Sequence, residues 1–165
     1  MSTRTIIIGL VLFCIILIIG LIVGSTEPNS TVKILSYTTN DKARPKAEVK
    51  STAADLGKMK VSDEKAASFT VKNSGQKPLQ LYNITSSCMC TAGQVIVNGQ
   101  ASEEFGMHSE SNYVGEIAPG QSATVKVIYR PYQMPVYGAV EREVYVTTND
   151  PQNARLVFKV NAYVQ

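Results

Sequence analysis

The sequence contains no tryptophan, one histidine and three cysteines among its 165 residues. Without tryptophan it lacks the Cys…Trp…Cys pattern of antibody-type domains. The single histidine, His108, excludes a His-rich metal motif, and the chain has neither a phosphate-binding glycine loop nor a serine nucleophile elbow. We therefore expect a protein that is not an enzyme.

Charge of one sign does not dominate the chain. It has 16 lysines and arginines against 13 aspartates and glutamates, a net charge of +3. A nucleic-acid-binding protein would show a basic face or stripe. Residues 41–50 contain four basic side chains, but Asp41 and Glu48 interrupt them, as is typical of a solvated spacer. The sequence predicts no nucleic-acid partner.

One long hydrophobic run stands near the N-terminus. Ile6–Val23 comprises eighteen residues without a charged or strongly polar side chain. As a helix it would be roughly 27 Å long, close to the hydrocarbon thickness of a bilayer. Arg4 precedes the run and Glu27 follows it, so the charge bias predicts that residues 1–5 are cytoplasmic and the rest extracytoplasmic, in the periplasm or at the cell surface.

This hydrophobic run is too long for the central segment of an ordinary signal peptide. Val23-Gly24-Ser25 is also a poor match to a small-x-small cleavage site. We therefore favour an uncleaved, single-pass transmembrane anchor over residues 6–23. Residues 24–45 are polar, with Pro28 and Pro45 near their two ends, and are predicted to form a spacer that lifts residues 46–165 off the membrane.

Residues 46–165 alternate short strand-like runs with turn signals and show no helical periodicity. The predicted strands include residues 47–52, 68–72, 79–84, 94–97, 123–129, 143–147 and 156–164. A turn is predicted at Asn73-Ser74-Gly75, from residues that tolerate positive φ, and a type II turn at Pro119-Gly120. Residues 98–113 are predicted to be a polar loop.

About seven short strands in a region of this size predict an immunoglobulin-like antiparallel β-sandwich. Cys88 and Cys90 are too close in sequence to join one sheet to the other, so the core must hold the sandwich together. The side chains expected to face inward on two of the longer strands are Val125, Val127, Tyr129, Leu156, Phe158, Val160, Ala162 and Val164.

The order of motifs resembles a known family. The motifs are Asp55-Leu56-Gly57, Asn73-Ser74-Gly75, Ser87-Cys88-Met89-Cys90-Thr91, Pro119-Gly120 and Thr148-Asn149-Asp150-Pro151. They are similar to those of a large bacterial family of secreted or membrane-anchored domains of unknown function. Its fold is like that of the Ig-like domains of the major-sperm-protein, ASH and HYDIN type. The resemblance covers roughly residues 46–165 and implies this fold and location, but no reaction. Family members usually carry glycine where this chain has Met89.

The Cys88-Met89-Cys90 segment has three open interpretations. In the first, the cysteines are structural and could be joined in a disulfide, although the required Cα separation is hard to meet across one residue. In the second, their thiolates bind Cu(I), because residues i and i+2 of a strand share a face and soft ligands suit this metal. The other candidate ligands are Met89, Met107, His108 and Met134.

In the third interpretation the same two cysteines catalyse thiol–disulfide exchange, with His108 activating a thiol. Reactive cysteines need an electropositive and partly exposed setting, and no helix N-terminus is predicted here to supply one. The sequence thus favours a membrane-anchored module with a binding or assembly role. Its partner is expected to be a protein, bound through an interface or by strand addition.

Overall fold

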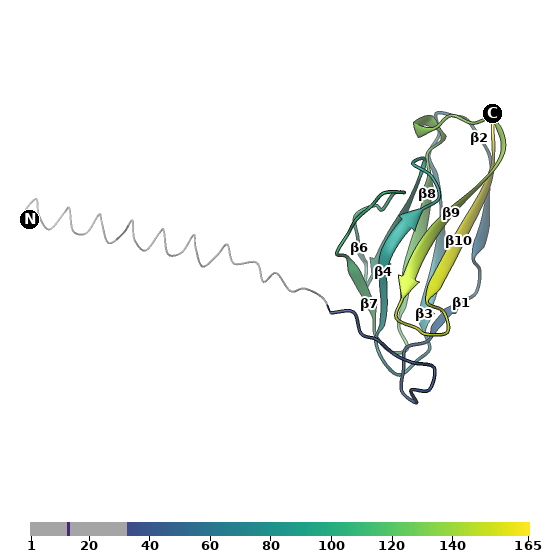
Figure 1. Ribbon diagram of the computed structural model, residues 1–165. Helices are drawn as coiled ribbons and strands as arrows, with labels where there is room; N and C mark the ends of the chain where they lie inside the picture. The colour runs from purple at the N-terminus through teal and green to yellow at the C-terminus, as the bar shows by residue number, and fades with distance from the viewer. Residues whose placement is uncertain (1–12, 14–32) are drawn as a thin grey trace, which may run out of the picture. The chain divides into compact units, whose positions relative to one another are not determined.

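The computed structural model of the chain describes Phe13 and residues 33–165 (Figure 1). The predicted anchor, residues 6–23, and the first part of the predicted spacer lie outside the described residues except for Phe13. Among the described residues, no helix is long and apolar enough to cross a membrane. Val32–Gln165 form one compact unit, which includes the whole of the predicted β-domain.

Within residues 33–165, ten strands form two five-stranded sheets (Figure 1). Sheet A has the order β1 (Ala47–Val49), β3 (Lys65–Asn73), β8 (Ser122–Tyr129), β5 (Thr91–Val97) and β6 (Gln100–Ala101). Sheet B has the order β2 (Ala53–Met59), β10 (Arg155–Val164), β9 (Gly138–Thr148), β4 (Leu79–Ser86) and β7 (Val114–Ile117). A short 3₁₀ turn, η1 (Pro131–Gln133), follows β8. The β2–β10 pair is parallel and the others are antiparallel, so the predicted all-β sandwich is confirmed.

The core lies between the sheets, as the alternation of apolar and polar residues predicts. All eight side chains expected to face inward on β8 and β10 are buried. Phe69 from sheet A and Phe158 from sheet B meet at its centre, with ring centroids 5.1 Å apart. Aromatic rings at this separation attract each other beyond the burial of their area. Packing across the two sheets therefore stabilises the sandwich.

The type II turn predicted at Pro119-Gly120 is confirmed. The Gln121 amide donates to the Ala118 carbonyl at 3.0 Å, and Gly120 has a φ of +79°. Proline presets φ at the first central position of such a turn, and glycine accepts the positive φ at the second. This turn joins β7 in sheet B to β8 in sheet A.

Three strands were not predicted. The single strand expected over residues 47–52 is instead β1, which ends at Val49, followed by a crossing to sheet B and β2. Residues 53–59 contain Asp55, Gly57 and Lys58 and show no strict alternation, so β2 could not be predicted from a strand pattern.

The hairpin of β5 and β6 turns at Asn98-Gly99, both at positive φ. That Asn-Gly pair is the sequence signal for a two-residue hairpin, and it lies inside the predicted polar loop. β7 follows directly after that loop.

The turn at Asn73-Ser74-Gly75 forms, but not for the expected reason. Gly75 is not at positive φ. Its amide donates to the Asn73 side-chain oxygen at 3.0 Å, and the backbone of residues 44–46 passes directly against its α-carbon. Glycine is required here because a second backbone segment approaches closely.

Gly75→Ala is therefore expected to lower the free energy of unfolding by about 1–3 kcal/mol. A Cβ at this position would overlap the Arg44 carbonyl oxygen and lie 2.5 Å from the Lys46 nitrogen. Urea unfolding of the variant measures the effect. Gly106→Ala is the matched control, since the atom nearest to its Cβ is Ser109 Oγ at 3.9 Å. Equal stability of the two variants would contradict this explanation.

Candidate functional site

The predicted cysteine site lies where the chain crosses from sheet B to sheet A. Residues 87–90 connect the end of β4 to the start of β5. The Ser87 amide donates to the Glu143 carbonyl at 2.9 Å, and the Glu143 amide donates to Ser87 Oγ at 2.9 Å. The Arg130 amide, next to η1, donates to the Cys90 carbonyl at 2.8 Å. Hydrogen bonds thus hold both ends of the crossing, one end to β9 and the other to the residue that follows β8.

Cys88 and Cys90 form a disulfide in the structure, with an S–S distance of 2.06 Å. Their Cα atoms are 5.3 Å apart. This separation is in the usual range for disulfides, although we expected it to be hard to reach across one residue. Cys90 is fully buried, whereas Cys88 is half-buried. The Thr91 hydroxyl lies 3.2 Å from Cys88 Sγ and must be the donor, because a disulfide sulfur carries no proton. The two sulfurs therefore differ in their access to solvent.

A positive charge lies beside the buried sulfur. Arg142 on β9 donates from Nε to Cys90 Sγ at 3.2 Å. The same guanidinium lies over the ring of Tyr129, 5.6 Å from the ring centroid. A cation in this position is favourable to any negative charge that forms on the sulfur.

Cys90 belongs to a small hydrophobic cluster apart from the main core. Its buried members are Met59, Cys90, Tyr129, Val140, Ala162 and Val164. Tyr129 is fully buried, and its hydroxyl has no hydrogen-bond partner among the described residues. Buried hydroxyls normally have one. An unused hydrogen-bond donor is thus buried in the cluster that holds Cys90.

An ion-pair group borders the crossing on the side of sheet A. Arg130 contacts Glu104 through two guanidinium nitrogens, at 2.6 and 3.0 Å, and Glu64 at 2.6 Å. The hydrogen bond from Arg130 is the main cause of a lowered pKa at Glu104, and the Glu104 carboxylate raises the pKa of Arg130. The group fixes the segment before Phe105 and the turn before β3 against the end of β8.

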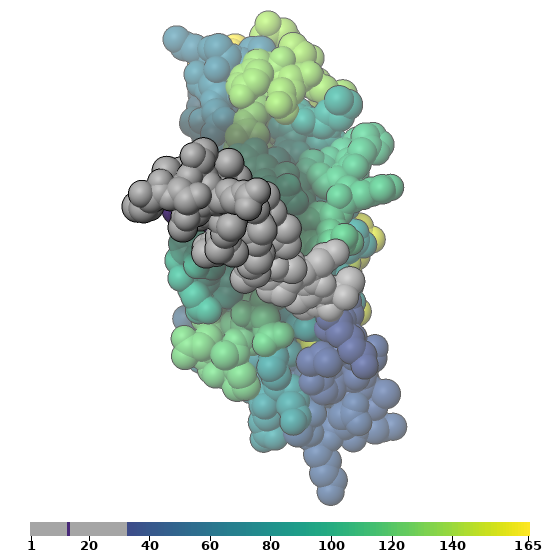
Figure 2. All heavy atoms as spheres, turned by 90° about the vertical axis from the view of Figure 1, so that its left-hand side faces the viewer, coloured from purple at the N-terminus to yellow at the C-terminus, as the bar shows by residue number. Residues whose placement is uncertain are grey.

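The other predicted copper ligands lie on exposed surfaces. Met89 is 64% exposed, Met107 44% and Met134 45%, and His108 is also exposed. Met134 directly follows η1. The η1 segment lies at the upper end of the described domain in Figure 1 and Figure 2. Among the described residues, no group of three or more His, Cys, Asp or Glu side chains is placed to hold a metal ion. Because each sulfur is bonded to the other, Cu(I) binding would require reduction first. It stays a prediction from the sequence.

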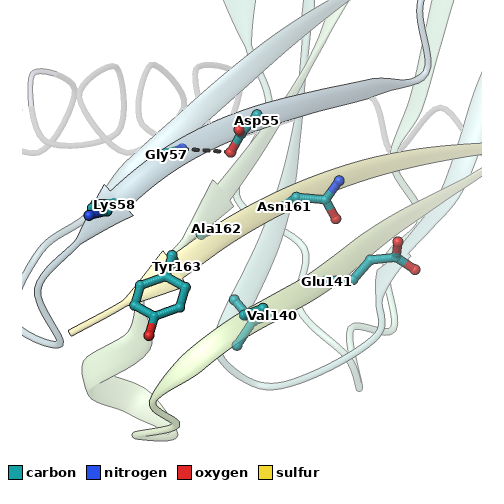
Figure 3. Close-up of a pocket in the computed structure, with 9 residues that line it drawn as sticks. Asp55, Gly57, Lys58, Val140, Glu141, Asn161, Ala162 and Tyr163 are labelled. Atoms are coloured by element: carbon teal, nitrogen blue, oxygen red, sulfur yellow. Dashed lines mark hydrogen bonds between the residues drawn. The ribbon is translucent and has the colours of Figure 1, made fainter.

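A shallow groove of about 470 Å³ lies on sheet B (Figure 3). It runs across β2, β10 and β9 and is lined by Asp55, Lys58, Glu141, Asn161 and Tyr163 among others. Asp55 Oδ1 accepts a hydrogen bond from the Gly57 amide at 2.8 Å, where β2 bulges. The groove is open and its charges are mixed, so its lining indicates no particular ligand.

A polar network occupies the start of β4, at the far end of this strand from the cysteines. Asp150 is fully buried and accepts hydrogen bonds from the amides of Ala47 and Gln152 and from Asn153 Nδ2, at 2.8–3.0 Å. Asn149 Oδ1 accepts from the Gln80 amide at 2.8 Å. These contacts attach β1 and β4 to the turn after β9, so this motif is structural.

Residues 45–161 match the HYDIN/CFA65/VesB-like family of Ig-like domains. The chain belongs to this family. The predicted relationship to HYDIN-type Ig-like domains is thereby confirmed. No curated protein sequence is significantly similar to this HYDIN/CFA65/VesB-like chain.

Several solved structures are similar to this HYDIN/CFA65/VesB-like domain. One is a protein of unknown function from Porphyromonas gingivalis W83, with 22% identity and a TM-score of 0.54, matched over 72% of this chain and 46% of that one. Another is the ASH/PapD-like domain of human CEP192, with 13% identity, a TM-score of 0.46 and 84% and 98% coverage. A third is the VesB protease of Vibrio cholerae, with 16% identity, a TM-score of 0.42 and 71% and 31% coverage. Of these three, only the Porphyromonas gingivalis protein has a TM-score above 0.5, and at 22% identity its likeness shows the fold alone.

Two site residues of the HYDIN/CFA65/VesB-like domain were missed by sequence reasoning. Arg142 lies 52 positions after Cys90, and Tyr129 was assigned only to the core. Neither has a spacing relationship to the cysteines. Their proximity arises because the crossing from β4 to β5 lies against β9 and the end of β8. These two residues could be identified as neighbours of Cys90 only once the pairing of strands distant in sequence was known.

Proposed function

We propose that the protein is a membrane-tethered, extracytoplasmic module that binds a protein partner by strand addition. The apolar run at residues 6–23 supports the tether and the location. Membership in a family of Ig-like domains supports a binding role. The observation that carries the proposal is an uncovered strand edge in sheet A.

That edge belongs to β3. β1 pairs only with Val71, Lys72 and Asn73, and the chain then crosses to sheet B. In the described part of the chain, Lys65–Thr70 pair with β8 on one side and with no strand on the other. In a strand paired on one side, every second residue directs its backbone N–H and C=O groups to the open side. This stretch therefore offers about three such residues, and it is long enough to pair with an extended peptide.

The neighbouring edge strand of sheet B is blocked. Lys65 Nζ donates to the carbonyls of Leu56 and Lys58 on β2, at 2.8 and 2.9 Å. β2 also bulges at Gly57, where φ is +67°. Bulges and lysine side chains are common means of preventing strand addition at an edge. Because Lys65 itself belongs to β3 and its side chain bridges to β2, the part of the β3 edge that is left open is residues 66–70.

The exposed face of this edge suits an extended segment of another protein. Ala66, Ser68 and Thr70 point outward and are exposed, and they are small or carry a hydroxyl. Such side chains leave room for a partner strand without imposing a charge requirement. Backbone hydrogen bonds would then supply most of the affinity.

Ser68→Lys places a charge at the middle of the open edge and is expected to weaken partner capture. A fall of about tenfold, or roughly 1.4 kcal/mol, is expected in quantitative pull-downs of the tagged full-length chain from native membranes. Thr124→Lys is the matched control. Thr124 lies on the same outer face but on β8, a central strand, directly opposite Thr70.

The control variant should capture the partner as well as the unchanged protein does. Capture that is equal for Ser68→Lys and the unchanged protein would refute binding at the β3 edge. A loss of capture shared by both lysine variants would equally refute it, because the effect would then come from charge on the outer face of sheet A.

A further inference from the structure

We propose that Cys88 and Cys90 form a thiol–disulfide exchange site for a protein or small-molecule dithiol. The incoming thiolate attacks Cys88 Sγ, and Cys90 leaves as a thiolate beside Arg142. The site is at the crossing from β4 to β5, and none of its residues belongs to the β3 edge. The proposal therefore stands or falls independently of partner binding.

Burial determines which sulfur is attacked. In thiol–disulfide exchange, the incoming thiolate bonds to one sulfur and the other sulfur leaves as a thiolate. The attacked sulfur must therefore be accessible. Cys88 is half-buried and is followed by Met89, which is 64% exposed, so the chain surface is open on this side. Cys90 is fully buried in a cluster with Met59 and Val164. Attack on Cys90 would require entry into that cluster, so Cys88 is the electrophilic sulfur.

The surroundings of Cys90 stabilise it as the leaving group. Arg142 Nε lies 3.2 Å from its sulfur, and an arginine guanidinium carries a positive charge. A charge-assisted hydrogen bond to an anion is roughly twice as strong as one between neutral groups. The hydroxyl of Tyr129, for which the described part of the chain offers no hydrogen-bond partner, lies in the same buried cluster. The thiolate that forms is thus met by a cation already in place.

Reduction should leave the domain folded. The disulfide closes a ring across a sequence separation of only two, so its loop-closure entropy contributes little to stability. The hydrogen bonds from the Ser87, Glu143 and Arg130 amides hold the crossing without the S–S bond. The reduced thiols therefore stay near each other and can be oxidised again.

The exchange is balanced in two steps. In the first, one thiolate of the dithiol forms a bond to Cys88 Sγ, the Cys88–Cys90 bond breaks and Cys90 leaves as a thiolate. In the second step, the other thiolate of the dithiol attacks the dithiol sulfur that is bonded to Cys88. The mixed disulfide breaks, and Cys88 leaves as a thiolate. The dithiol is oxidised to a disulfide, and two electrons and two protons pass to the cysteine pair. In the reverse direction the reduced cysteine pair reduces a partner disulfide and becomes a disulfide again.

Trapping with a monothiol tests which sulfur is attacked. The full-length chain is incubated with glutathione, newly freed thiols are alkylated, and peptides are mapped by mass spectrometry. We expect glutathione on Cys88 and the alkyl group on Cys90. Glutathione on Cys90, or no adduct without denaturant, would overturn the proposal.

Reduction by dithiothreitol tests the role of Arg142. Arg142→Ala is expected to slow the second-order rate by about tenfold, because the leaving thiolate loses its cation, and Arg142→Lys should restore part of the rate. Arg155→Ala is the matched control. Arg155 lies at the first position of β10, on the same sheet, and its guanidinium is 4.2 Å from the ring centroid of Tyr145 rather than near a sulfur. Equal rates for Arg142→Ala and Arg155→Ala would contradict the proposal.

Discussion

Replacing Phe158 with alanine is expected to lower the free energy of unfolding by about 3–5 kcal/mol. Phe158 is fully buried at the middle of β10, and its ring packs on Phe69 from the opposite sheet at 5.1 Å between centroids. The substitution removes the burial of the ring and leaves a cavity between the sheets. Urea unfolding followed by circular dichroism measures the loss.

Tyr163→Ala is the matched control for this effect. Tyr163 is an aromatic residue on the same strand, but it faces outward and is 50% exposed. Its removal should cost less than about 1 kcal/mol, since it leaves no internal cavity. If the two variants lost similar stability, the assignment of the inward face of β10 would be wrong.

Asp150→Ala is expected to lower the free energy of unfolding by about 3 kcal/mol, because three donors, one of them the buried amide of Ala47, lose the fully buried carboxylate that accepts from them. These donors are the amides of Ala47 and Gln152 and the side chain of Asn153. The bond to Ala47 holds the first residue of β1. Amide hydrogen exchange should therefore show faster exchange at β1, in addition to the lower stability seen in urea.

Asp55→Ala controls for the loss of a carboxylate. Asp55 is exposed and accepts one hydrogen bond within its own strand, from Gly57. Its removal is expected to change stability by about 0.5–1 kcal/mol. Unchanged exchange at β1 in Asp150→Ala would show that this carboxylate does not hold the strand in place.

Alternation along the chain was enough to predict the sandwich and its core. β8 and β10 repeat apolar residues at every second position, and burial of one face follows directly from the pleat of a strand. The same reasoning failed for β2, where Asp55, Gly57 and Lys58 interrupt the pattern because this strand lies at an edge and bulges. Edge strands bury less surface, so their sequences carry a weaker signal.

Only the part of the candidate site that is local in sequence, the pair Cys88 and Cys90, was predicted. The spacing of Cys88 and Cys90 indicated that their sulfurs could meet. It did not indicate that Arg142 would lie beside Cys90, because this contact depends on the pairing of β4 with β9. Likewise, the open edge of β3 results from the early crossing of the chain after β1, which no single segment encodes.

Site-specific photo-crosslinking in native membranes tests binding at the β3 edge most directly. A photo-reactive amino acid replaces Ser68 in the full-length chain, and in a second variant it replaces Thr124 on the neighbouring central strand. We predict a discrete crosslinked protein product from position 68 and none from position 124. No product from position 68, or products of equal yield from both positions, would contradict the account.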